Sequence, residues 1–186
     1  MGKKHKAQFG LIERDDSLLV MIDMQEKLFP VMAEKEALLS QVMKLIRFSK
    51  IAGLPVIVTE QEKLGPTLPE LLGEGTAVAA VPKVDFNCFG CEAFVKRVGE
   101  SGKRTLILCG IEAHICVAQT ALYAASDYEV HVVADAIASR SAENRRVALE
   151  RMARSGVTIT TTEMVIYELL KRAGTDTFKE VLKLVK

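Results

Sequence analysis

Short continuous runs of apolar residues alternate along this chain with segments in which apolar side chains recur every three or four positions. Continuous runs of about four to eight residues are typical of strands covered on both faces, and the wider spacing is typical of helices that bury one face. On this basis we predict strands over residues 17–23, 54–60, 76–81, 105–110, 129–135 and 157–161. Helices are predicted over residues 37–53, 92–98, 116–127 and 141–156, with two more near the end. In the last of these, Thr177 and Glu180 have the spacing of a capping box.

Strands that alternate with helices need crossover connections, which produce a mainly parallel sheet. We therefore predict a three-layer α/β/α fold with a mainly parallel six-stranded sheet in the Rossmann-like order 3-2-1-4-5-6. The 186 residues fit one domain, with residues 1–14 as a flexible tail or lead-in. The longest stretch without a pattern, residues 60–75, exceeds a passive connector and favours a role in a site or an interface.

Three residues with reactive side chains follow the predicted strands at the same edge of the sheet. Asp23 ends the first strand, Lys83 follows the third by two residues, and Cys116 comes soon after the fourth. In the predicted order the strand sequence reverses between the first and fourth strands, which is where ligands collect in such folds. The topology therefore predicts that a carboxylate, an amine and a thiol lie around one crevice.

These three groups could support nucleophilic catalysis. A free thiol is only about 3% ionised at neutral pH. We predict that a helix start and the ammonium of Lys83 lower the pKa of Cys116 by about two units, so that the thiolate predominates. Asp23 would be the general base, and backbone N–H groups at the helix start would hold an oxyanion. The alternative is that Cys116 is a small buried core residue, which is common for free cysteine.

Composition narrows the possible partners. With 25 basic and 24 acidic residues the net charge is +1, which argues against a nucleic-acid-binding face. No apolar stretch reaches membrane-spanning length and no signal peptide is evident, so we expect a cytoplasmic protein whose four cysteines are free and which has no membrane partner. No G-x-G-x-x-G follows the first strand, which argues against NAD, and we expect no cofactor.

Cys88 and Cys91 form a C-x-x-C pair that could have a redox role. A zinc ribbon would need a second such pair, which the chain lacks. We interpret both thiols as structural or incidental, and the redox alternative stays open.

Three motifs in order, "VMIDMQ", "VPK" and "GIEAHICVAQTA", resemble those of the isochorismatase-like cysteine hydrolase family. The likeness extends from about Asp16 to Thr162. The segments "VIVTEQEKLGPTLPEL" and "VVADAIASRSAENRRVALERMARSGVTITTTE" are most similar to the branch of isochorismatase-domain-containing proteins, whose substrates are poorly defined.

The resemblance implies a catalytic triad of Asp23, Lys83 and Cys116. It also implies a non-proline cis peptide at Ile111–Glu112, with the backbone N–H groups of Glu112 and Cys116 forming an oxyanion hole, and a homo-oligomer. Nicotinamidases of this family carry an Asp-x-His-x-His metal site after the second strand. Here the corresponding loop contains no histidine, so we expect no metal. True isochorismatases lack the nucleophilic cysteine, so Cys116 favours covalent acyl transfer.

Four further residues are candidates for a substrate pocket: Phe29, Gln61, Phe86 and His114. The two aromatic residues could equally belong to the core, Gln61 could bind neighbouring loops, and His114 could be structural. We predict a hydrolase that cleaves a C–N bond of a small amide-like substrate through a thioester. The alternative is a catalytically idle interaction or scaffold protein of the same fold. The sequence does not specify the substrate.

Overall fold

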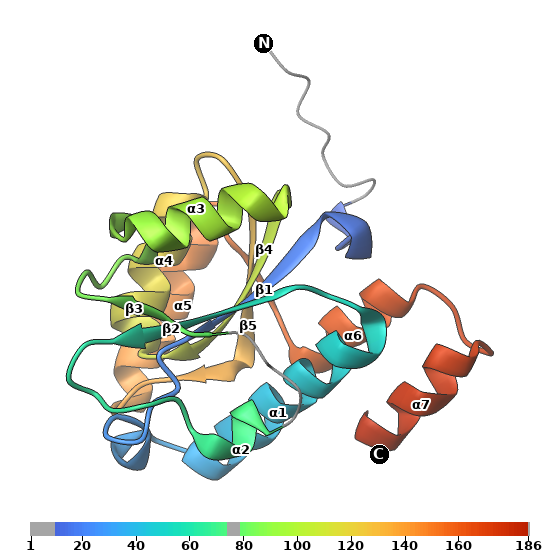
Figure 1. Ribbon diagram of the computed structural model, residues 1–186, viewed down its shortest axis with the longest axis horizontal. Coiled ribbons are helices and arrows are strands. Elements are labelled where there is room, and N and C mark those ends of the chain that lie inside the picture. Colours follow the sequence, from blue (N-terminus) through green and yellow to red (C-terminus); the bar gives the residue numbers. More distant parts are fainter. Residues whose placement is uncertain (1–9, 74–78, 186) are drawn as a thin grey trace.

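The computed structural model describes residues 10–73 and 79–185 and confirms the predicted sheet order (Figure 1). Six parallel strands lie in the order β3-β2-β1-β4-β5-β6. The strands are β1 (Ser17–Ile22), β2 (Val56–Gln61), β3 (Val81–Lys83), β4 (Thr105–Ile111), β5 (Glu129–Ala138) and β6 (Thr158–Thr160). Within the described ranges, no helix has the length and apolar character needed to cross a membrane.

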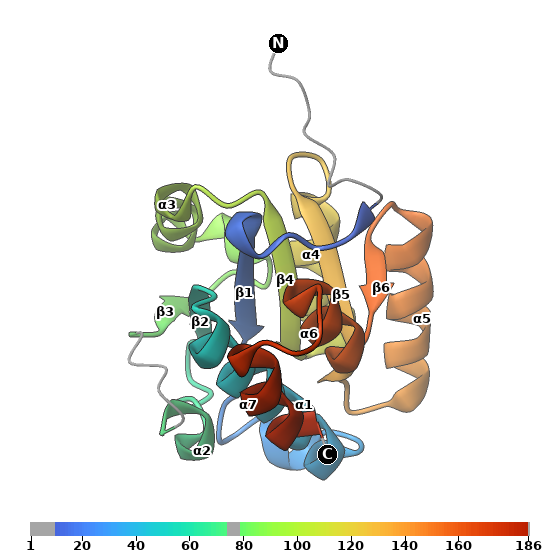
Figure 2. The same cartoon turned by 90° about the vertical axis from the view of Figure 1, so that its right-hand side faces the viewer.

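Helices cover both faces of the sheet (Figures 1 and 2). One layer contains α1 (Lys35–Ala52), α6 (Thr162–Leu170) and α7 (Asp176–Val185), and the other contains α3 (Glu92–Ser101), α4 (Ala118–Ala124) and α5 (Ala142–Arg154). The shorter helices are α2 (Pro69–Leu72), the 3₁₀ turns η2 (Arg14–Asp16), η3 (Phe29–Val31) and η4 (Cys88–Gly90), and the π-helical turn η5 (Ala113–Val117).

The central strand β1 explains why the sequence pattern could be interpreted so directly. All its residues are buried. Successive side chains of a strand point to opposite faces. Leu19 and Met21 accordingly join the core beneath α1 and α6, whereas Leu18 and Val20 join the core beneath α3 and α4. A strand covered on both faces is apolar at every position, which produces a continuous run in the sequence.

The third strand was predicted in the wrong place. Residues 76–78 of the predicted strand lie outside the described residues, and β3 itself spans Val81–Lys83. Its register, which pairs Thr59 with Val81 and Gln61 with Lys83, places it beyond the apolar run. Pro82 fits there because β3 is an edge strand, where a missing N–H is tolerated. Lys83 is therefore the last residue of a strand rather than part of a loop.

The two ends of the described chain differ from expectation in detail. In the lead-in, the side chain of Ile12 is 1% exposed and its N–H donates to the Glu168 carboxylate at 3.0 Å. At the other end, Thr175 rather than Thr177 caps α7, since its hydroxyl accepts the N–H of Phe178 at 3.0 Å. Helix α7 begins at Asp176, so the predicted capping box starts two residues too late.

Gly110 allows β4 to approach β1 closely. The residue has a φ of 113°, and a Cβ atom placed on it would lie 2.0 Å from the carbonyl oxygen of Ile22. Gly110 pairs with Ile22 in the sheet, directly before Asp23. Only glycine combines this backbone conformation with this contact.

We expect Gly110→Ala to lower the free energy of unfolding by at least about 2 kcal/mol, because the methyl group overlaps backbone that cannot move aside. The measurement is urea denaturation followed by circular dichroism. Gly99→Ala is the control: Gly99 lies inside α3, and its Cβ would meet nothing within 4 Å. Helix propensity predicts a gain of about 0.5–1 kcal/mol there. Equal stability of the two variants would contradict the steric argument.

Candidate active site

The three predicted reactive residues meet at the carboxyl ends of the strands. Asp23 directly follows β1 with a φ of 52°, a left-handed conformation that aspartate tolerates better than most residues. Lys83 ends β3, and Cys116 lies on the π-helical turn η5 after β4. Each side chain is thus positioned by a different strand, and the order of the sheet brings the three together.

A buried ion pair forms the centre of this group. The Lys83 ammonium donates to Asp23 Oδ2 at 2.7 Å, and both side chains are 0% exposed. The second carboxylate oxygen, Oδ1, accepts the hydroxyl of Thr59 at 2.7 Å. The Asp23 N–H donates to the carbonyl of Thr59 at 3.2 Å. Asp23 is therefore fixed at its backbone and at both carboxylate oxygens.

The same ammonium connects the carboxylate to the sulfur. Lys83 Nζ lies 3.8 Å from Cys116 Sγ, 2.7 Å from Gln61 Oε1 and 3.3 Å from the carbonyl oxygen of Asp85. Burial by itself lowers the pKa of Lys83, but Asp23 and the nearby sulfurs more than offset this, and the net pKa is raised. Lys83 therefore remains a cation at neutral pH.

The prediction that these fields lower the pKa of the Cys116 thiol is wrong, because the pKa is raised. The residue is 5% exposed, and burial raises its pKa to about 12. The Asp23 carboxylate raises it further, while the Lys83 ammonium lowers it. The Asp23–Lys83 pair is already neutral, so ionising the thiol would leave one uncompensated buried negative charge. Cys116 is therefore a thiol at neutral pH, close to the Asp23 carboxylate and the Lys83 ammonium.

The backbone before Cys116 has the form that the resemblance implied. The Ile111–Glu112 peptide bond is cis. The carbonyl of Glu112 accepts the N–H groups of Ile115 at 3.1 Å and Val117 at 3.2 Å. The second of these bonds makes the turn a π-helix rather than the first turn of an α-helix, and such turns are frequent at functional sites.

The Glu112 side chain is also held in place. It is 4% exposed, and its carboxylate accepts the backbone N–H of Arg140 at 3.0 Å and the side-chain Nε at 3.1 Å. This contact ties the segment after β5 to the segment that carries Cys116. Sequence reasoning assigned only the backbone of Glu112 and gave its side chain no partner.

The four candidate pocket residues differ in their surroundings. Gln61 binds Lys83 and the carbonyl of Val84, so both ends of its amide contact protein. His114 Nδ1 lies 2.9 Å from the hydroxyl of Ser139. Phe29 packs partly buried against the core, and Phe86 is 53% exposed in the segment after Lys83.

Two further residues lie beside the triad, and sequence reasoning assigned neither of them to this site. Thr59 binds the Asp23 carboxylate, and its place opposite Ile22 in the sheet could have revealed it. Cys88 is 0% exposed, and its N–H donates to the Thr120 hydroxyl at 3.0 Å. Burial raises the pKa of Cys88 to about 11, although the nearby Lys83 opposes this. All four cysteines are free thiols.

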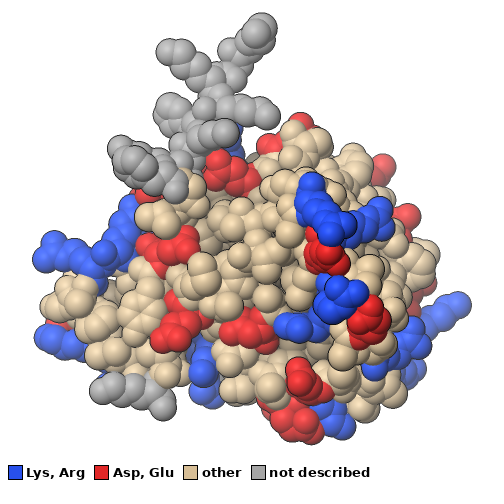
Figure 3. All heavy atoms as spheres, turned by 180° about the vertical axis from the view of Figure 1, so that it is seen from behind, with Lys and Arg blue, Asp and Glu red and all other residues tan. Residues whose placement is uncertain are grey.

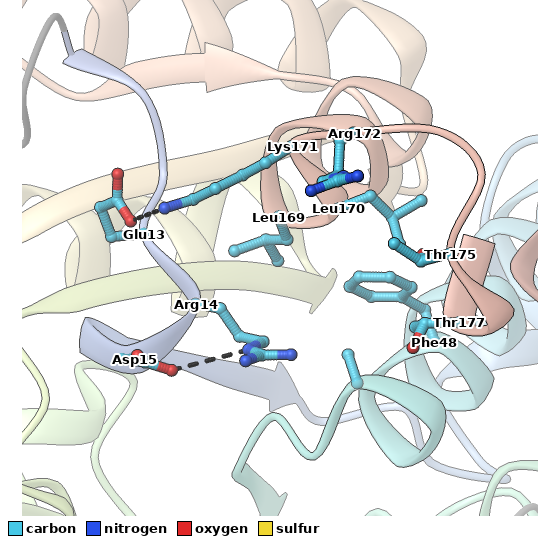
Figure 4. Close-up of a pocket in the computed structure, with 11 residues that line it drawn as sticks. Glu13, Arg14, Asp15, Phe48, Leu169, Leu170, Lys171, Arg172, Thr175 and Thr177 are labelled. Atoms are coloured by element: carbon cyan, nitrogen blue, oxygen red, sulfur yellow. Dashed lines mark hydrogen bonds and ion pairs between the residues drawn. The ribbon is translucent and has the colours of Figure 1, made fainter.

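The cavity in Figure 4 lies away from these residues. It is bounded by the lead-in to β1, the end of α1 and the α6–α7 connection, which places it toward the amino ends of the strands. Among the residues that line it, Lys171 pairs with Glu13, and Arg14 pairs with its sequence neighbour Asp15. On the face shown in Figure 3, acidic and basic side chains are interspersed rather than gathered into a single-sign field.

The sequence model of the isochorismatase domain matches residues 17–164. This chain belongs to the isochorismatase family. Isochorismatase domain-containing protein 2A of Mus musculus is 36% identical over 97% of this chain and 88% of its own length. The family fold suggests a hydrolase-like function.

Solved structures of isochorismatase-fold proteins are similar over nearly the whole chain. A Caenorhabditis elegans protein described as MAR1 ribonuclease is 33% identical, with a TM-score of 0.87 over 94% of this chain and 92% of that one. The Escherichia coli YcaC gene product, described as an octameric hydrolase of unknown specificity, is 26% identical, with a TM-score of 0.89 over 96% and 92%.

The resting thiol form of Cys116 leads to a pH prediction. We expect its alkylation by iodoacetamide to accelerate about tenfold per pH unit from pH 7 to 10 without a plateau, because the thiolate fraction grows in that proportion below the pKa. Peptide mass spectrometry measures the rate at Cys116 separately from those at the other cysteines. A plateau near neutral pH would show instead that the thiolate predominates there.

Proposed function

We propose that this protein is a cysteine hydrolase that cleaves the C–N bond of a small amide-like substrate. The observation that carries the proposal is the position of one buried ammonium, 2.7 Å from the Asp23 carboxylate and 3.8 Å from the Cys116 sulfur. Nucleophile, proton acceptor and a fixed positive charge are the parts that covalent catalysis by a thiol requires.

In the first half-reaction, the Cys116 sulfur attacks the carbonyl carbon of the substrate while its proton moves to Asp23. The carbonyl π electrons move to oxygen, and the N–H groups of Glu112 and Cys116 would hold this oxyanion. As the tetrahedral intermediate collapses, Asp23 returns the proton to the leaving nitrogen, the C–N bond breaks, and a thioester and an amine are formed.

In the second half-reaction, water attacks the thioester carbonyl and gives a proton to Asp23. Collapse of this intermediate breaks the C–S bond, releases the carboxylic acid and returns the proton to sulfur. The proton and electron balance closes without any cofactor. Lys83 stays charged throughout. It holds the Asp23 carboxylate by a hydrogen bond of 2.7 Å and stabilises the sulfur as negative charge develops.

The high pKa of resting Cys116 fits this scheme. A sulfur that loses its proton only during attack never leaves an isolated thiolate in a buried site. The proton acceptor must then lie close to the sulfur, and the common ammonium keeps Asp23 beside it.

Two other interpretations of the fold make different predictions. A scaffold protein would retain the residues and turn nothing over. The ribonuclease description belongs to the Caenorhabditis elegans protein, and the near-neutral net charge of the present chain does not favour an RNA partner.

Because the Escherichia coli neighbour is an octamer, we propose a homo-oligomer for this chain too. We also propose that it is a cytoplasmic protein.

The proposal is tested by a turnover screen of small amides, ureides and carbamates, with single-stranded RNA included as a further substrate. We expect hydrolysis of at least one amide-like compound, and we expect Cys116→Ala to lower kcat at least about 1,000-fold because the thioester cannot form. Full turnover by Cys116→Ala would refute covalent catalysis. RNA cleavage in place of amide hydrolysis would support the ribonuclease interpretation.

Asp23→Asn separates reactivity from catalysis. Removing the carboxylate lowers the pKa of Cys116, so we expect alkylation at pH 8 to be about tenfold faster. Turnover should nevertheless fall at least about 100-fold, because no group remains to accept the thiol proton. Alkylation rates and kcat measured on the same preparation give this comparison. If Asp23 merely maintained the structure, alkylation of the buried Cys109 would accelerate together with that of Cys116, whereas we expect the rate at Cys109 to stay unchanged.

A further inference from the structure

The loops after β1 and β2 are joined beside the triad. The N–H of Glu26 donates to the carbonyl of Pro66, and the N–H of Lys27 donates to the carbonyl of Leu64, at 3.1 Å each. In the opposite direction, the N–H of Leu68 donates to the carbonyl of Met24 at 2.9 Å. The long segment that the sequence assigned to a site or interface is thus held against the residues that follow Asp23.

A fully buried glutamine lies inside this junction. Gln25 is 0% exposed, and its side-chain Nε2 donates to the carbonyl of Gln61 at 3.0 Å and to that of Gly65 at 2.6 Å. Its Oε1 accepts the N–H of Gln61 at 2.9 Å. Gln25 therefore uses both amide hydrogens and its oxygen, and it binds Gln61 at both the N–H and the carbonyl.

Gln61 in turn binds the catalytic lysine. Its Oε1 accepts the Lys83 ammonium at 2.7 Å, while its Nε2 donates to the carbonyl of Val84 at 2.6 Å. The Val84 carbonyl can only accept, so it fixes which end of the amide is the NH₂ group and directs the oxygen toward Lys83. Gln61 is thus oriented from its backbone by Gln25 and from its side chain by Val84.

We propose that Gln25 and Gln61 are positioning residues that set where the charge of Lys83 lies relative to Cys116. The inference rests on the proposed function, in which that charge stabilises the developing thiolate. Gln61 is a neutral acceptor at the same distance as Asp23, 2.7 Å, so it holds the ammonium without cancelling its charge. It also holds the ammonium 3.8 Å from the sulfur rather than in closer contact.

This role does not depend on the predicted contact of Gln61 with substrate, which stays a prediction. The Gln61 side chain uses one of its two N–H groups and one oxygen lone pair in the contacts with Val84 and Lys83. A glutamate at this position would have similar size, but its charge would oppose that of Lys83 at the sulfur. A methionine would have similar length and would be only a weak acceptor for the ammonium.

The experiment measures alkylation of Cys116 by iodoacetamide at pH 8.5, which needs no substrate. We expect Gln61→Glu to slow the reaction about tenfold, because the added charge raises the thiol pKa by about one unit. Gln41→Glu is the matched control. It makes the same charge change on α1, on a different element from any residue of the triad, and should leave the rate unchanged.

In the Gln61→Met variant we expect the alkylation rate of Cys116 to change in the opposite direction. The N–H of Lys83 that no longer binds Gln61 can turn to the sulfur, so alkylation should be about threefold faster. A merely structural role would loosen the site and accelerate alkylation in both variants, which would overturn the proposal, as would unchanged rates in both. If Gln61→Glu does not fold, the Gln61→Met variant is sufficient by itself. Alkylation of Cys116 in that variant at an unchanged or lower rate would overturn the proposal.

The outcome is separable from that of the proposed function. Opposite shifts in alkylation with no turnover of any substrate would support the positioning role and remove the hydrolase. Turnover that depends on Cys116, together with alkylation rates that are the same in the Gln61 variants, would support the hydrolase and remove the positioning role.

Discussion

The structure of the site depends on one buried ion pair, between Asp23 and Lys83. Taking two charges out of water costs several kcal/mol per ion, and their attraction repays this only when hydrogen bonds satisfy the remaining sites. Here the carboxylate also binds Thr59, and the ammonium also binds Gln61 and the Asp85 carbonyl. The pair therefore requires β1, β2 and β3 to end at matching levels, which parallel registers provide.

The pair also determines the state of the sulfur. A lone ammonium beside a cysteine would favour the thiolate, as in many reactive sites. Asp23 already neutralises this ammonium, so the sulfur sees little net positive charge and burial decides its pKa. The same carboxylate that keeps Cys116 protonated at rest is available to take its proton during attack. High pKa and nucleophilic function are thus compatible, provided that proton transfer accompanies bond formation.

The sequence revealed the architecture because strands covered on both faces leave continuous apolar runs, and the sheet order follows from the alternation with helices. It misplaced β3 because an apolar run around Ala79 and Ala80 precedes the strand, whereas pairing with Thr59–Gln61 fixes the actual register. The sequence correctly predicted that Asp23, Lys83 and Cys116 lie at one edge of the sheet. The thiol pKa was wrong because burial depends on tertiary packing, which no local motif records.

Strand order alone does not create such a site. Neighbouring strands lie about 4.8 Å apart, whereas catalytic groups must be placed to within about 0.5 Å. Local features of the backbone supply the difference. The left-handed conformation of Asp23 falls at the residue directly after β1 that carries the carboxylate, and the missing side chain of Gly110 lets β4 approach β1. The π-helical turn then sets the position of Cys116 after β4.

Each of these features departs from regular secondary structure: Asp23 has a positive φ, Gly110 occupies a position that only glycine fits, and the turn that carries Cys116 is π-helical. Irregular backbone is ordinarily unfavourable and is retained where the surrounding structure enforces it, typically near sites. In this protein they lie at the carboxyl ends of the two central strands, β1 and β4, where the strand order reverses. The regular part of the sheet thus selects which residues can meet, and the irregular residues at its edge determine the distances at which they do.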